Sequence, residues 1–94
     1  GGHGVISTTS NVAPAEMVSL VQCFNSGDLQ GARTMHYRLL PLIEAMFSET
    51  NPIPVKAAQA LRGLCEEEIR LPLLPISSDN RERLRISLKE FGLL

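Results

Sequence analysis

The chain has 94 residues, a net charge of −1, and a composition in which 44% of residues are hydrophobic and 20% are charged. These values are ordinary for one small globular domain. The near-neutral charge gives no electrostatic reason to bind nucleic acid or an anionic membrane. No apolar run approaches the roughly 18 residues of a transmembrane helix, and we expect neither a membrane span nor a signal segment.

The two cysteines, Cys23 and Cys65, are far apart in the sequence and lie outside any metal-ligand spacing. We expect both to be small buried side chains with free thiols. Free thiols are typical of a reducing compartment, so we expect the protein to be cytoplasmic. A disulfide between them is the alternative that the sequence leaves open.

The first predicted element is a strand over residues 4–8, GVIST. Val5 and Ile6 are adjacent, so both faces of this strand carry an apolar side chain, as in a strand buried inside a parallel sheet. Such a strand needs neighbours, because its backbone N–H and C=O groups are otherwise unpaired. No second strand of similar quality follows, so we expect the chain to be a fragment whose missing strands lie upstream.

Four helical segments are predicted after this strand. The first covers residues 14–26, with Pro14 suited to its first turn and Gly27 at its end. The second begins after Asp28, a good N-cap residue, and carries apolar residues at helical spacing as far as Phe47.

The third helix begins in the turn that contains Pro52 and Pro54, and it ends at Gly63. Residues 70–77 are expected to be extended, because each of their prolines disfavours helix in the residue before it. The segment therefore separates the third helix from the last one.

The last helix is expected to be capped by Ser78 or Asp79 and closed by Gly92. The patterns thus predict a mainly α chain, with one strand, about four helices, and about two-thirds of the residues helical.

Four stretches of the sequence resemble a known enzyme family: GGHGVISTTSNVAP at the start, NPIPVKAA and RLPLLPIS further along, and GLL at the end. Together they resemble the C-terminal third of the 4-hydroxy-tetrahydrodipicolinate synthase (dihydrodipicolinate synthase) family, in order and over all 94 residues. This family belongs to the pyruvate-dependent aldolases and lyases. Its relatives, such as N-acetylneuraminate lyase, are alternatives that resemble the chain less closely around residues 51–56.

The resemblance implies a fold and an activity. Enzymes of this family are α/β TIM (β/α)8 barrels with a C-terminal helical appendage. Residues 1–27 would be the last strand and helix of the barrel, and residues 28–94 the appendage. The family condenses pyruvate with L-aspartate-4-semialdehyde through a lysine Schiff base, in diaminopimelate and lysine biosynthesis. It needs no further cofactor, and its members are commonly homotetramers.

The resemblance assigns one substrate-binding position to this chain, Ile6, which would line the pyruvate pocket near the end of the strand. An apolar wall suits the methyl group of pyruvate and excludes water from the Schiff base. Gly4 and residues 7–10 are secondary candidates for the same pocket. The alternative is that Ile6 only fills the barrel core.

The family's catalytic lysine, tyrosine and paired threonines belong to upstream strands, so we expect no catalytic residue here and no activity from this chain alone. Lys56 and Lys89 are expected to be ordinary solvated lysines. His3 and His36 have no carboxylate or cysteine at ligand spacing, so no metal site is expected.

Two classes of function stay open: a part of a carbon–carbon bond-forming lyase, and a stand-alone helical interaction domain. The apolar strand favours the first class, because a helical module has no need of it. For the chain on its own we predict self-association into a two-fold dimer through residues 4–8, since pairing would satisfy both the amides and the apolar side chains.

Overall fold

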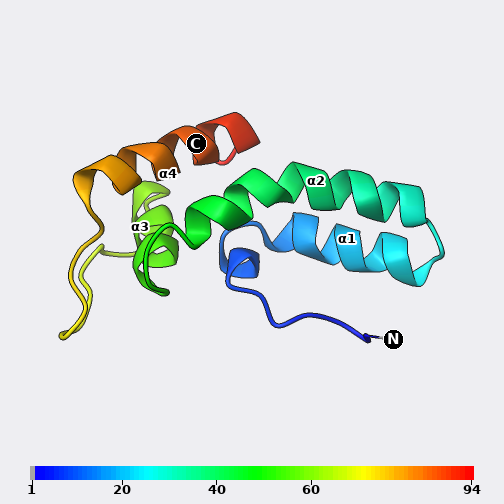
Figure 1. Cartoon of the computed structure of the whole chain (residues 1–94), viewed down its shortest axis with the longest axis horizontal. Coiled ribbons are helices and arrows are strands. Elements are labelled where there is room, and N and C mark those ends of the chain that lie inside the picture. Colours follow the sequence, from blue (N-terminus) through cyan, green and yellow to red (C-terminus); the bar gives the residue numbers. More distant parts are fainter. Residues whose placement is uncertain (1) are drawn as a thin grey trace.

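The computed structural model of the chain describes residues 2–94 and contains four α-helices after a short 3-10 turn, η1 (Thr9–Asn11) (Figure 1). The helices are α1 (Pro14–Asn25), α2 (Leu29–Met46), α3 (Ile53–Leu61) and α4 (Ser78–Phe91). The mainly helical prediction is confirmed. The helices occupy little more than half of the chain rather than two-thirds, because residues 62–77 contain none.

The predicted strand over residues 4–8 is wrong for this chain: the structure describes no strand anywhere in residues 2–94. The segment is an extended tail that passes beside α1 without joining a sheet (Figure 1). The side chain of Ile6 is fully exposed and that of Val5 is 59% exposed. A strand is held by hydrogen bonds to a neighbouring strand, and this part of the chain has no second strand to pair with.

Helices α1 and α2 form an antiparallel pair at one end of the molecule (Figure 1). Pro14 lies in the first turn of α1, as predicted, and Gly27 adopts a φ of 83° in the turn that follows the helix. Asp28 caps α2, as predicted, because its Oδ1 accepts a hydrogen bond from the Gly31 N–H at 2.8 Å. A Cβ added to Gly31 would lie 2.2 Å from Asp28 Oδ2, so any other residue there would displace the Asp28 carboxylate from its present position.

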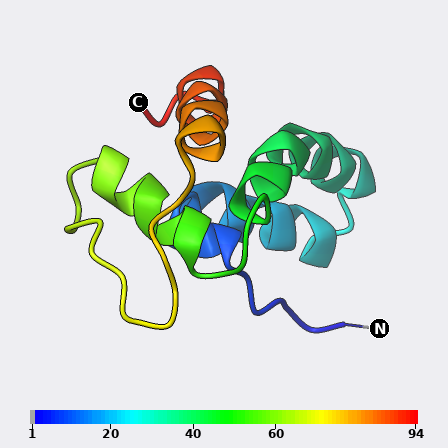
Figure 2. The same cartoon turned by 60° about the vertical axis from the view of Figure 1, so that its left-hand side comes forward.

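The core is centred on α2, which packs against α1 and also against α4 (Figure 2). Leu39, Leu42 and Met46 of α2 are fully buried, and so is Leu88 of α4. The other buried apolar residues of this core are Val12, Ala13, Met17, Ile53, Val55, Ala57, Ala58, Ile76 and Leu84. One continuous core therefore joins the segment before α1 to all four helices.

Residues 62–77 form a long loop that projects from the molecule between α3 and α4 (Figure 2). Its second half contains no helix, as its prolines predicted. One ion pair ties the loop to α4, since Arg81 Nη2 lies 2.8 Å from Glu67 Oε2. The hydrogen bond from Arg81 holds the pKa of the Glu67 carboxyl below its ordinary value.

Helix α4 begins one residue earlier than a Ser78 cap predicts and two residues earlier than an Asp79 cap predicts. Ser77, rather than Ser78 or Asp79, is the N-cap residue, and its hydroxyl accepts a hydrogen bond from the Asn80 N–H at 3.4 Å. Ser77 has an extended backbone with a ψ of 151°, which makes it the last residue outside the helix. Gly92 ends α4 in the left-handed conformation, as predicted.

Glu49 connects the turn between α2 and α3 to the start of α4. Its Oε1 accepts hydrogen bonds from the Ser77 hydroxyl at 2.6 Å, the Ser77 N–H at 3.0 Å and the Asn80 side-chain amide at 2.8 Å. The Ser77 hydroxyl and then the Asn80 amide lower the pKa of Glu49 by stabilising its charged form. A carboxylate is therefore needed there for the full strength of these bonds.

We expect Glu49→Gln to lower the free energy of unfolding at pH 7 by about 0.5–1 kcal/mol, because neutral acceptors bind more weakly and the group is partly solvated. A depressed pKa stabilises the fold above the pKa of the unfolded chain, about 4.3, and this stabilisation is lost as the pH falls through the folded value. Urea unfolding should show a smaller difference from wild type at pH 3 than at pH 7. The exposed Glu44→Gln is the control, and an equal difference at both pH values would contradict the assignment.

Candidate functional site

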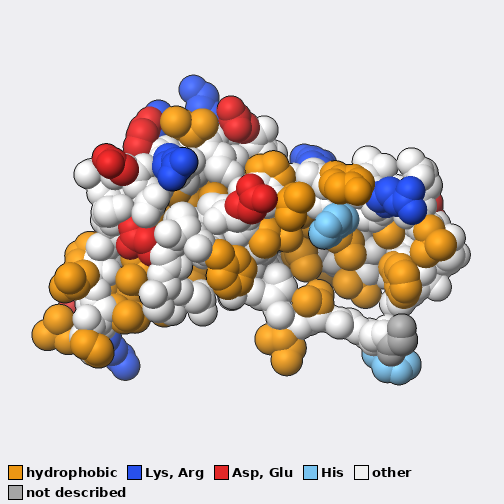
Figure 3. Space-filling view, in the orientation of Figure 1, with side chains coloured by type: hydrophobic (Ala, Val, Ile, Leu, Met, Phe, Trp, Pro, Cys, Tyr) orange, Lys and Arg blue, Asp and Glu red, His pale blue; other side chains and the backbone are white. Residues whose placement is uncertain are grey.

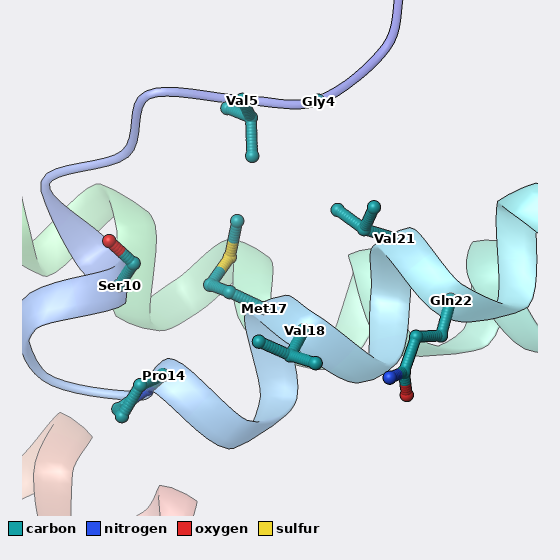
Figure 4. Close-up of a pocket in the computed structure, with 8 residues that line it drawn as sticks. All are labelled: Gly4, Val5, Ser10, Pro14, Met17, Val18, Val21 and Gln22. Atoms are coloured by element: carbon teal, nitrogen blue, oxygen red, sulfur yellow. The ribbon is translucent and has the colours of Figure 1, made fainter.

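The side chain of Ile6 is fully exposed, so the described residues do not enclose it in a pocket. Its assignment to a substrate pocket therefore stays a prediction, which depends on residues from another part of the family fold. Val5, its neighbour, points to the other side of the segment, toward α1 (Figure 4). The two side chains thus face different surroundings, as the alternation along an extended chain requires.

The turn that follows Ile6 is fixed by its own side chains. Ser10 donates from its N–H to Ser7 Oγ at 3.1 Å and from its hydroxyl to the Ser7 carbonyl at 2.6 Å. Asn11 Nδ2 donates to the Thr8 carbonyl at 3.0 Å, and Thr9 is almost fully buried. The candidates among residues 7–10 therefore have a structural role, which is to hold the chain in a compact turn.

An apolar groove lies between the N-terminal segment and α1 (Figure 4). It has a volume of about 440 Å³. Its lining residues are Gly4, Val5, Ser10, Pro14, Met17, Val18, Val21 and Gln22. Met17 is buried, but Val18 is 54% exposed and Phe24, on the same helix, is 53% exposed. The groove has few polar groups, so it is suited to packing against another apolar surface rather than to chemistry.

A second, more polar cleft lies between the turn at residues 8–11 and α3. It has a volume of about 380 Å³. Its lining residues are Thr8, Asn11, Asn51, Pro52, Val55, Lys56, Gln59 and Cys65. We call it the turn–α3 cleft. Lys56 is half-buried on its wall, whereas Lys89 is exposed on α4.

One side chain of α3, Gln59, and that of its C-cap residue, Arg62, bind the backbone of the loop before α1. Gln59 Nε2 donates to the carbonyl of Asn11, and Arg62 Nη1 donates to the carbonyl of Val12 at 2.6 Å. Sequence patterns did not single out Gln59 or Arg62, because each contact joins residues about fifty positions apart. No local motif signals such a pair.

Within residues 2–94, no group of three histidine, cysteine or acidic side chains is close enough to hold a metal ion. His36 lies on the exposed face of α2, with its ring 5.6 Å from that of Tyr37. Cys23 and Cys65 are free thiols, but Cys65 is exposed and Cys23 only half-buried, so the expectation that both are buried is wrong. None of the helices described in residues 2–94 is long and apolar enough to cross a membrane.

Comparison with known proteins gives consistent matches over the whole chain. The sequence model of the dihydrodipicolinate synthetase family matches residues 1–91. Over 94 residues the chain is 53% identical to the 4-hydroxy-tetrahydrodipicolinate synthase of Endomicrobium trichonymphae and 56% identical to that of Thermotoga maritima. Each match covers 100% of this chain and 32% of the relative. The chain thus spans about a third of the length of the curated relatives it matches.

Solved structures of the same name share the fold of this chain. The dihydrodipicolinate synthase of Thermotoga maritima superposes with a TM-score of 0.98 at 56% identity, covering 100% of this chain and 32% of that one. The Acinetobacter baumannii enzyme, a chloride-inhibited form complexed with pyruvate, gives a TM-score of 0.96 at 40% identity, with the same coverage.

Proposed function

Because the chain belongs to the dihydrodipicolinate synthetase family, we propose that it forms the C-terminal third of a 4-hydroxy-tetrahydrodipicolinate synthase. That enzyme is a lyase that joins pyruvate to L-aspartate-4-semialdehyde. The observation that carries the proposal is the match over the whole chain, at 53% and 56% identity, to relatives of that name. The intact enzyme would be a homotetramer in the cytoplasm.

In this proposal residues 1–27 supply the last strand and helix of a (β/α)8 barrel, and residues 28–94 form the helical appendage. A barrel of this kind needs about 250 residues, so its other strands come from outside this chain. The unpaired segment before η1 and the apolar groove beside it support this arrangement, because neighbouring strands would cover both. A stand-alone helical interaction domain does not explain why an unpaired apolar segment precedes the helices.

Ile6 would lie near the C-terminal end of the last strand, where barrel enzymes hold their substrates. Its apolar side chain would contact the methyl group of pyruvate and keep water from the Schiff base, which forms on a lysine of the upstream chain. The fixed turn at residues 7–11 supports this role, because it begins one residue after Ile6 and holds the backbone there.

A chimera tests the proposal: the matching 94 residues of the Thermotoga maritima enzyme are replaced by this chain. We expect the chimera to condense the two substrates at a rate within about tenfold of the parent, because the fold of this region is shared. Ile6→Ala should then raise KM for pyruvate about tenfold, as expected when several apolar carbons leave a binding pocket. The measurement is steady-state kinetics with varied pyruvate.

Val5→Ala is the matched control, since it shortens the neighbouring apolar side chain on the opposite side of the segment and should leave KM nearly unchanged. A chimera that folds but fails to form the pyruvate Schiff base would contradict the proposed function. Equal effects of the two substitutions on KM would contradict the role of Ile6 alone.

A further inference from the structure

We propose that Gln59 of α3 and Arg62, the C-cap residue of α3, are positioning residues for the pyruvate pocket: they hold the loop that follows Ile6 and so fix the position of Ile6. The inference rests on the proposed function, because it concerns the same pocket. It assigns to the helical appendage a direct part in shaping the substrate site, through two side chains that do not touch the substrate.

The first step is the pair of hydrogen bonds that Gln59 and Arg62 donate to the loop before α1. Val12 and Ala13 are fully buried just before α1, where backbone carbonyls need a donor. Arg62 Nη1 supplies one to the Val12 carbonyl at 2.6 Å, and Gln59 Nε2 supplies one to the Asn11 carbonyl. Two adjacent carbonyls are thus fixed from one helix, which restricts the rotation of the peptide units as well as their position.

The second step is the set of hydrogen bonds that connects Asn11 and Val12 to the residue after Ile6. The Val12 N–H donates to the Thr9 carbonyl at 2.9 Å, and the Asn11 N–H donates to the Thr8 carbonyl at 3.1 Å. Ser7 then binds Ser10 through two further hydrogen bonds. Overlapping hydrogen-bonded turns therefore connect the residues held by Gln59 and Arg62 to Ser7, the residue that follows Ile6.

The third step is the effect expected when substitutions remove the hydrogen bonds from Gln59 and Arg62. Gln59 Oε1 is buried and has no hydrogen-bond partner among the described residues. Gln59→Met removes this unpaired acceptor together with the donor, so its net effect on stability should be small. Arg62→Met keeps the apolar stem of the side chain but removes the donor. The double variant therefore releases the loop without shortening any apolar side chain of the core.

The first experiment uses the 94-residue chain and needs no catalysis. Hydrogen exchange followed by mass spectrometry should show the amides of residues 9–13 exchanging at least about tenfold faster in Q59M/R62M than in wild type, with α2 and α4 unchanged. Arg38→Met is the control, because Arg38 lies over the Phe91 ring on another part of the surface. Unchanged exchange at residues 9–13, or equally faster exchange in all helices, would overturn the proposal.

The second experiment places Q59M/R62M in the Thermotoga maritima chimera. We expect KM for pyruvate to rise about three- to tenfold, with kcat within about twofold, because a misplaced wall weakens binding. Arg62→Lys, which keeps a charged donor, should recover part of the loss. An unchanged KM, or a proportional loss of kcat without a change in KM, would overturn the positioning role. An unsubstituted chimera without activity would refute the proposed function, whereas the exchange experiment would still decide whether α3 holds the loop.

Discussion

Treatment of the 94-residue chain with pyruvate and borohydride should leave its intact mass unchanged. Borohydride reduces a Schiff base between pyruvate and a lysine to a stable adduct, so each reacting lysine would add one pyruvate-derived group. A lysine forms such an adduct efficiently when burial in an apolar pocket or a neighbouring cation activates its amine. Neither of the chain's two lysines is fully buried.

Lys89 is exposed on α4, and the half-buried Lys56 lies on the wall of the turn–α3 cleft, which mixes polar and apolar residues and is open to solvent. The Thermotoga maritima chimera is the positive control, because the proposed function predicts a pyruvate adduct on the part that comes from the relative. A stable adduct mapped by peptide mass spectrometry to Lys56 would contradict the expectation.

The isolated chain should sediment with about twice the mass of one copy at high concentration. Figure 3 shows hydrophobic side chains on the surface near the α1–α2 pair, and Ile6 and Phe24 are among the exposed ones. Burying a side chain such as that of Ile6 contributes about 1.5–3 kcal/mol, and pairing of the N-terminal segments would also satisfy their unpaired amides. A two-fold dimer is the simplest assembly that does both.

Ile6→Asp should shift the chain toward monomer in analytical ultracentrifugation. Its helical circular dichroism signal should be retained, because Ile6 is fully exposed and lies outside the core. Tyr37→Asp, at an exposed site on α2, is the control for an added charge and should leave the dimer intact. A wild-type chain that remains monomeric at high concentration would show that the segment does not associate.

The helices were predictable because their signals are local. Pro14, Asp28, Gly27 and Gly92 act through their own backbone geometry or through partners three residues away, so the sequence is enough to recognise them. The strand expected over residues 4–8 was wrong for this chain, because a strand also needs a neighbouring strand to pair with and residues 2–94 contain none. The alternation of side chains in a short segment is therefore not enough to predict a strand.

The candidate site shows the same division. The resemblance supplied Ile6, but the hydrogen bonds from Gln59 and Arg62 to the loop join distant parts of the chain and depend on the packed fold. The ion pair between Glu67 and Arg81 is also a contact between distant residues, and the run of three glutamates does not indicate which of them forms it. Long-range polar contacts need a structure, whereas caps and turns do not.

The continuous core has a consequence for how genes of this family can recombine. Met17 of α1 and Val12 of the preceding loop are buried in the same cluster as Leu39 and Leu42 of α2, across the boundary between residues 27 and 28. A crossover at that boundary would combine the buried side chains before residue 28 from one parent with those after it from another. These two sets of side chains would not have been selected to pack together. A crossover before residue 4 would transfer the core, the turn at residues 7–11 and the hydrogen bonds from Gln59 and Arg62 together. Viable natural hybrids should therefore inherit the segment from residue 4 onward as one unit.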